Sequence, residues 1–346
     1  MIETSLHQSE PVALPGRPTG RVARSIAAHA LLTVLMVVTS MLVFVPAALL
    51  HCGIRNGRRA AWITAAIVLA FIALYVAALP VAKADEAGQA WSNVAALTFV
   101  LLLPSLAVLP LVQRAEKFGP VLIFLVTGSA LGLAVTEIAS RTLVNYSPFA
   151  MQIAMAKASN SKIVEFYRVN GAPADALQTM ERWLHYSMTV LPGVMLIALA
   201  TMFVLSLLML GRLQAWRELA AARGDGEAAG AYFFRNLSLP DWVLFAFIIG
   251  GLTPLATGLL QKVAANTLAV VAFLYILQGL AIFRSLLLAM GGGFAGKTLG
   301  WLLLVFLMLT GVAPLLLGVA GLFDSFFDFR HFKKKRKDDS HESHSD

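Results

Sequence analysis

The sequence predicts an all-α protein that crosses a lipid bilayer several times. Hydrophobic residues make up 58% of its 346 residues and charged residues only 13%, and the mean hydropathy is +0.76. A soluble globular chain carries charge on about a quarter of its residues. The apolar residues also gather in a series of runs that are long enough to span a bilayer as helices. The fold class is therefore a polytopic transmembrane helix bundle.

We expect about eight spans, joined by short polar turns and by two longer polar segments. The last run, residues 299–322, contains no charged residue. Pro46 lies inside the first run and either kinks it or splits it into two half-helices, which would change the parity of the spans. The predicted spans are residues 27–50, 60–81, 91–112, 119–139, 186–210, 242–260, 263–289 and 299–322.

Two segments outside these runs have the spacing of amphipathic helices at the bilayer surface. From Pro173 onward, one helical face gathers five apolar side chains, Ala176, Leu177, Met180, Trp183 and Leu184. A shorter stripe within residues 211–241 contains Leu213, Trp216 and Leu219. In the fourth span, Gly128 and Gly132 form a G-x-x-x-G pattern that favours close helix packing, with a ligand passage as the alternative.

The two ends of the chain are polar, so the predicted transmembrane domain covers residues 26–330. Residues 1–25 and 331–346 are expected to be disordered. The five consecutive basic residues 333–337 follow the last span, which predicts a cytoplasmic end that attracts anionic lipids. With an even number of spans, both termini are expected on the cytoplasmic side of a bacterial inner membrane. We expect membrane lipids as partners and no nucleic acid, because no base-reading module accompanies the basic run.

The sequence contains no common catalytic or cofactor motif. It lacks G-x-S-x-G, H-E-x-x-H, a P-loop and a dinucleotide fingerprint. We therefore expect a protein that is not an enzyme and that holds no cofactor and no metal. Without an ATP-binding motif, the chain is not a primary pump by itself. Its one cysteine, Cys52, excludes an internal disulfide.

Polar side chains inside the spans are the candidate ligand-binding residues, because they are costly to place in a membrane. Glu137 lies four residues before Arg141 and either forms an interfacial ion pair with it or serves as a binding or proton-linked carboxylate. Asn266 and Gln278 either hydrogen-bond a neighbouring helix or contact a ligand. We take Glu137, Asn266 and Gln278 as candidates for ligand binding and Arg141 as structural.

A second polar group closes the last span. Asp324 and Asp328 are four residues apart and could bind a cation, but a hard metal needs more oxygen ligands than these two side chains offer. We favour an interfacial or structural role for Asp324, Asp328 and Arg330.

The last third of the chain contains three stretches that together carry a family resemblance. They are Leu239-Pro-Asp-Trp242, Asn266 followed by Leu277-Gln-Gly-Leu-Ala281, and the run from Gly321 to Arg330. Over about residues 238–330 the chain resembles the bacterial membrane-protein family of unknown function typified by YybS. More distantly, its Gly- and Pro-rich spans are similar to those of the substrate-binding subunits of energy-coupling-factor transporters.

Two functions are compatible with these observations. The distant resemblance implies capture of a small, vitamin-like ligand within the bundle and a transporter energising module as partner, and spans broken by Pro and Gly are common at transporter binding sites. The alternative is a non-transporting membrane scaffold or assembly factor. It would dock a partner through the surface helices and the basic tail.

Overall fold

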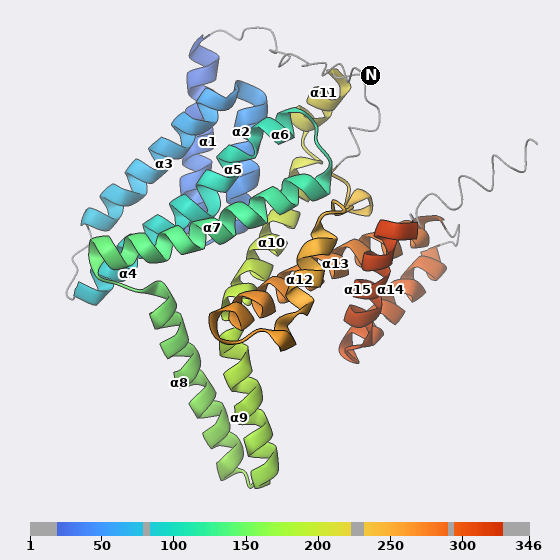
Figure 1. Ribbon diagram of the computed structural model, residues 1–346. Helices are drawn as coiled ribbons and strands as arrows, with labels where there is room; N and C mark the ends of the chain where they lie inside the picture. Colours follow the sequence, from blue (N-terminus) through green and yellow to red (C-terminus); the bar gives the residue numbers. More distant parts are fainter. Residues whose placement is uncertain (1–18, 79–83, 223–231, 290–293, 328–346) are drawn as a thin grey trace, which may run out of the picture.

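The computed structural model describes residues 19–78, 84–222, 232–289 and 294–327, and these residues contain helices and no strand (Figure 1). The all-α class is therefore confirmed. The α-helices are α1 (Thr19–Val38), α2 (Val45–Asn56), α3 (Arg58–Ala78), α4 (Ala84–Ala96), α5 (Leu103–Ala107), α6 (Leu109–Gln113), α7 (Phe118–Val144), α8 (Pro148–Val169), α9 (Ala174–Thr189), α10 (Leu191–Leu210), α11 (Gln214–Ala222), α12 (Val243–Gly251), α13 (Gly258–Ala289), α14 (Phe294–Leu309) and α15 (Val312–Phe327).

Six helical stretches within the described residues are long and apolar enough to cross a membrane, against about eight predicted. They are Gly20–Val38, Arg58–Ala78, Glu86–Gln113, Phe118–Val144, Leu191–Leu210 and Gly258–Leu288. The stretch Glu86–Gln113 runs through α4, the π-helical segment η2 (Leu97–Leu102), α5 and α6. A seventh is reached only if α14 and α15, which are bent by 110° at a break, count as one span.

The first predicted span, 27–50, is a helical hairpin instead of a single crossing. The chain turns at Ser40, whose φ is +58°, and α2 starts with Pro46 in its first turn, where a proline needs no hydrogen-bond partner. The side chain of Asn56 donates to Ser25 Oγ at 2.9 Å, so the end of α2 lies beside the beginning of α1. Both ends of the run therefore lie at the same end of the bundle, and the parity of the spans changes.

The predicted boundary between spans 242–260 and 263–289 was wrong. Helix α12 ends at Gly251 and a 3₁₀ turn over Thr253–Leu255 follows. Helix α13 then begins at Gly258, whose φ is +61°, and continues through the expected turn. The reason is that Pro254 lacks an amide hydrogen and stops α12 early. The last predicted span, 299–322, is also interrupted. Helix α14 ends at Leu309 and α15 begins at Val312, and between them lies Gly311, whose φ is +74°.

The long helix α13 contacts α10, α12 and α15 and closely approaches α15. An added Cβ at Gly279 would lie 1.9 Å from the carbonyl oxygen of Leu317, and one at Gly321 would lie 2.1 Å from that of Tyr275. Only glycine permits these contacts, which let two helix backbones touch. Gly132 has the same role on α7, where a Cβ would lie 2.1 Å from Phe99 O. The packing interpretation of the G-x-x-x-G pattern is therefore confirmed.

The two predicted amphipathic segments form α9 and α11, in different settings. Helix α9 pairs with α8 in a hairpin that projects from the bundle, and α10 continues α9 in nearly the same direction (Figure 1). No residue of α9 is buried. Helix α11 packs on α2 instead, with Trp216 buried and stacked on Tyr232 at 4.3 Å between ring centroids. Tyr232 is itself buried, and this raises the pKa of its hydroxyl.

The structure describes only part of the predicted terminal segments. Helix α1 begins at Thr19, inside the predicted arm 1–25, and residues 1–18 lie outside the described residues. The tail 331–346 also lies outside them.

Replacing Gly279 or Gly321 by alanine should lower the melting temperature of the purified protein in detergent. Each new methyl group would push α15 away from α13, and overpacking of this kind costs about 1–3 kcal/mol. Gly251→Ala is the matched control, because a Cβ there meets nothing within 4 Å. Equal melting temperatures for all three variants would contradict the contact between α13 and α15.

Candidate ligand site at the base of the helical hairpin

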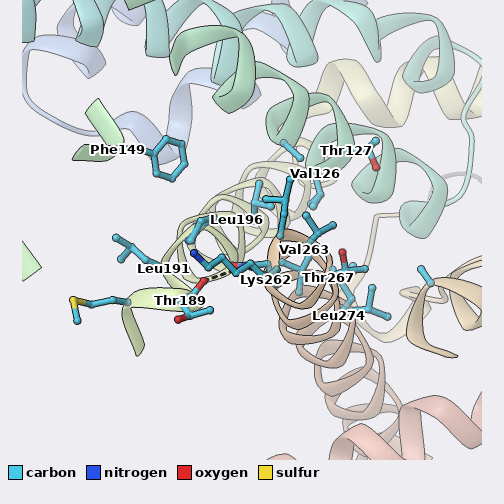
Figure 2. A pocket seen from close by; sticks show the side chains of 18 of the residues that line it. Val126, Thr127, Phe149, Thr189, Leu191, Leu196, Lys262, Val263, Thr267 and Leu274 are labelled. Carbon is cyan, nitrogen blue, oxygen red and sulfur yellow. Dashed lines mark hydrogen bonds between the residues drawn. The ribbon is translucent and has the colours of Figure 1, made fainter. Parts of the chain in front are cut away.

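A cavity of about 780 Å³ lies where the α8–α9 hairpin joins the bundle (Figure 2). One face of α13 lines it, with residues spaced by three and four from Leu259 through Lys262, Val263 and Asn266 to Leu274. At 1.5 Å per residue, this face extends about 22 Å along the helix. The cavity therefore reaches from the hairpin deep into the bundle.

The deep walls of the cavity are apolar. Helix α7 contributes Ile123, Val126 and Ala130 at helical spacing, and α12 contributes Val243 and Ala246. In Figure 2, Val126 and Thr127 lie across the cavity from the α13 residues Val263 and Thr267. The walls offer an aliphatic or aromatic group many contacts and few hydrogen bonds.

Basic residues from three different helices line the mouth of the cavity. Lys157 of α8, His185 of α9 and Lys262 of α13 line it, and each is exposed. No Asp or Glu from the described parts of the chain lines the same cavity. In Figure 2 the side chain of Lys262 extends from α13 toward Leu191 and Leu196 of α10. An anion at the mouth would therefore meet lysine ammonium groups from two helices and the imidazole of His185.

Asn266 is the predicted candidate that does line the cavity, and its amide already has backbone partners. Its Oδ1 accepts from the Gly193 N–H at 2.6 Å, and its Nδ2 donates to the carbonyls of Thr189 at 3.0 Å and Lys262 at 2.7 Å. Gly193 and Thr189 flank the break between α9 and α10. Asn266 therefore fixes this break to α13, and a role in ligand binding stays a prediction.

Glu137 is not among the lining residues and holds the base of the hairpin. It forms the predicted ion pair with Arg141, and its Oε1 accepts from Ser147 Oγ at 2.5 Å. Its Oε2 accepts from the Phe149 N–H at 3.1 Å. Ser147 is in turn the N-cap of α8, where it accepts from the Ala150 N–H. Since Phe149 lines the cavity, Glu137 positions one wall of it.

Gln278 lies away from the cavity, in the contact between α13 and α15. It is 2% exposed, its Oε1 accepts from the Leu239 N–H at 3.0 Å, and its Nε2 donates to Asp324 Oδ2 at 3.1 Å. The three stretches that carry the family resemblance thus meet here, through Leu239, Gln278, Asp324 and the glycine contact. Asp328 and Arg330 lie outside the described residues.

The structure does not bring the three predicted ligand-binding residues together, and it adds three that the sequence did not single out. Lys157, His185 and Lys262 come from three helices that are distant in sequence, so no spacing connects them. Each lies in a separate polar segment, so the sequence did not indicate that they share a cavity. Within the described residues, no three His, Cys, Asp or Glu side chains gather where they could hold a metal ion.

Comparison with known proteins assigns the chain to a family. A family model described as "Predicted membrane protein (DUF2232)" matches residues 25–325. The match covers most of the chain, which therefore belongs to this family of predicted membrane proteins of unknown function. No curated protein and no solved structure matches the chain.

Replacing Asn266 by leucine should destabilise the protein by about 1–3 kcal/mol, because the Gly193 N–H and the Thr189 carbonyl lose their side-chain partner in the bundle. Thermal unfolding in detergent measures the effect. Thr267→Val is the control, since Thr267 also lines the cavity but forms no hydrogen bond of this kind among those described. Similar melting temperatures for both variants would show that Asn266 does not hold the helix break.

Proposed function

We propose that this membrane protein binds an amphipathic small molecule with an acidic group, as the ligand-binding component of a transport system. One observation carries the proposal: the cavity combines deep apolar walls with Lys157, His185 and Lys262 at its mouth and has no lining carboxylate from the described residues. The ligand's apolar part lies along α13 and its acidic group at the mouth.

The apolar walls and the basic mouth contribute differently to the free energy of binding. For a ligand that arrives from water, each buried methylene contributes about 0.8 kcal/mol, which exceeds an exposed ion pair once a few methylenes are buried. For a ligand already dissolved in lipid, the apolar part gains little, because lipid tails are as apolar as leucine. The basic residues at the mouth then decide which molecule is selected.

We further propose that the hairpin projects on the extracytoplasmic side of a bacterial inner membrane. If the bent pair α14 and α15 enters and leaves the membrane on one side, as α1 and α2 do, the number of crossings is even and both termini are cytoplasmic. Basic residues concentrate at the end of the bundle where α1 begins, which fits the excess of Lys and Arg in cytoplasmic loops. The described basic residues at that end include Arg21, Arg24, Arg55, Arg58, Arg59, Arg114, Lys117, Arg212, Arg217 and Arg235. Those at the hairpin end include Arg141, Lys157, Lys162, Arg168, Arg182 and Lys262.

A transport role needs an energy source that the sequence does not encode in any common ATP-binding motif. The distant resemblance to substrate-binding subunits of energy-coupling-factor transporters supports an ATPase-coupled partner. The three stretches that resemble the family typified by YybS support assignment to that group. Partner binding at the cytoplasmic end would leave the cavity and the hairpin free.

A second candidate function is that of a scaffold that docks a partner protein, and the hairpin favours it. Helix α9 buries no residue and α8 buries only Val164 among its described residues. The side chains of Trp183 and Phe166 are 69% and 64% exposed. Crosslinking from the hairpin in intact membranes would favour this role if a partner protein were captured in stoichiometric amount and no small molecule were bound.

Filling the cavity should abolish ligand binding without unfolding the protein. Ala130 on α7 lines the cavity, so Ala130→Phe places a ring in the space that we assign to the apolar part of the ligand. Native mass spectrometry of gently purified protein should show a bound acidic amphiphile in the natural protein and none in the variant. Leu131→Phe is the matched control, because Leu131 is 65% exposed on the neighbouring position. Equal ligand occupancy in both variants would contradict the proposal.

The orientation predicts which engineered cysteines react from outside the cell. Cys52 is buried, so it should contribute little background labelling. Asn170→Cys in the turn of the hairpin should react with a membrane-impermeant maleimide in intact cells. Ala222→Cys at the end of α11 should react only after the cells are opened. The opposite pattern would place the hairpin in the cytoplasm.

A further inference from the structure

A second cavity, of about 440 Å³, lies between α8 and α9 and adjoins the first. Lys157, His185 and Met188 line both cavities. The two spaces therefore form one path from the outer part of the hairpin to the apolar walls along α13. We call the second space the hairpin cleft.

The lining of the hairpin cleft contains carboxylates, which the described lining of the first cavity lacks. Outward from the shared residues it contains Glu165, Arg168 and Glu181, besides the side chains of Asn160 and Ser161. Arg168 pairs with Glu165 at 2.8 Å and lies 3.8 Å from Glu181. Two carboxylates thus share one guanidinium, and the outer part of the cleft carries a net negative charge.

The charges along the path consequently have a fixed order. Glu181 lies one helical turn beyond His185 on the same face of α9, a separation of about 6 Å along the axis. Glu165 lies two turns beyond Lys157 on α8, about 12 Å farther out. From the inside outward, the path is apolar, then positive, then negative.

We infer that the ligand is zwitterionic, with its anionic group next to the apolar tail and an ammonium group at the end of a short linker. This inference rests on the proposed function. The tail lies along α13, and the phosphate or carboxylate lies among Lys157, His185 and Lys262. The ammonium group lies in the hairpin cleft beside Glu181. An ethanolamine-type phospholipid with one acyl chain has this order of groups.

Other head groups match the path less well. A head group that carries a second negative charge would bring it toward Glu181, where like charges repel. An uncharged polar head group would leave both the basic mouth and the acidic cleft without a charged partner. Because the pairs are exposed, each contributes modestly, so discrimination of about three- to fivefold is expected instead of an absolute choice.

The test compares two single-chain phospholipids with the same acyl chain in binding to the full-length protein in detergent. Lysophosphatidylethanolamine and lysophosphatidylglycerol share the phosphate and differ in the ammonium group. Titration followed by native mass spectrometry should show that the natural protein prefers the ethanolamine lipid by about three- to fivefold. Glu181→Gln should remove this preference and leave binding of the glycerol lipid nearly unchanged.

Two controls separate the possible outcomes. Asp175→Asn removes a carboxylate from the same helix outside the cleft and should keep the preference. Equal binding of both lipids by the natural protein, or an unchanged preference in Glu181→Gln, would overturn the inference and leave the proposed function intact. Binding of neither lipid, together with no co-purified acidic amphiphile, would overturn the proposed function as well.

Discussion

Backbone groups that are freed where helices break must find hydrogen-bond partners inside the bundle, because lipid offers none. This protein meets that requirement with side chains from distant helices. Asn266 binds the break between α9 and α10, Gln278 accepts from the Leu239 N–H, and Ser129 Oγ donates to the Val100 carbonyl at 2.7 Å. These side chains allow short and interrupted helices to pack in fixed positions.

The candidate site depends on two of these contacts. Asn266 fixes the beginning of α10 to α13, and Glu137 fixes the beginning of α8 to α7. The cavity lies between these two connections. Its apolar walls come from α7, α12 and α13, and its basic mouth comes from α8, α9 and α13. A mouth built from α8, α9 and α13 can recognise charge on a ligand, while the walls accept a range of apolar groups. Under the proposed function, this division would let the protein distinguish one amphiphile from the surrounding lipid.

Much of the fold could be predicted from the sequence, but the breaks in the helices could not be placed. The helices α3, α7 and α10 closely follow the predicted apolar runs, because hydropathy reports burial in lipid directly. A break depends on which backbone groups find partners, and Pro46 was compatible with a kink or a split until the contact between Ser25 and Asn56 decided it. Asn266 and Gln278 stood out as polar residues in a span, yet their partners come from remote segments. The basic mouth depends on three helices meeting and has no sequence pattern.

The nearly straight passage from α9 into α10 makes the hairpin a lever. Helix α9 extends about 24 Å from its junction with α10. A sideways force at its far end acts as a torque on that junction, where Thr189 and Gly193 are both bonded to Asn266. A force on the far end of the α8–α9 hairpin would therefore be transmitted to the wall of the cavity.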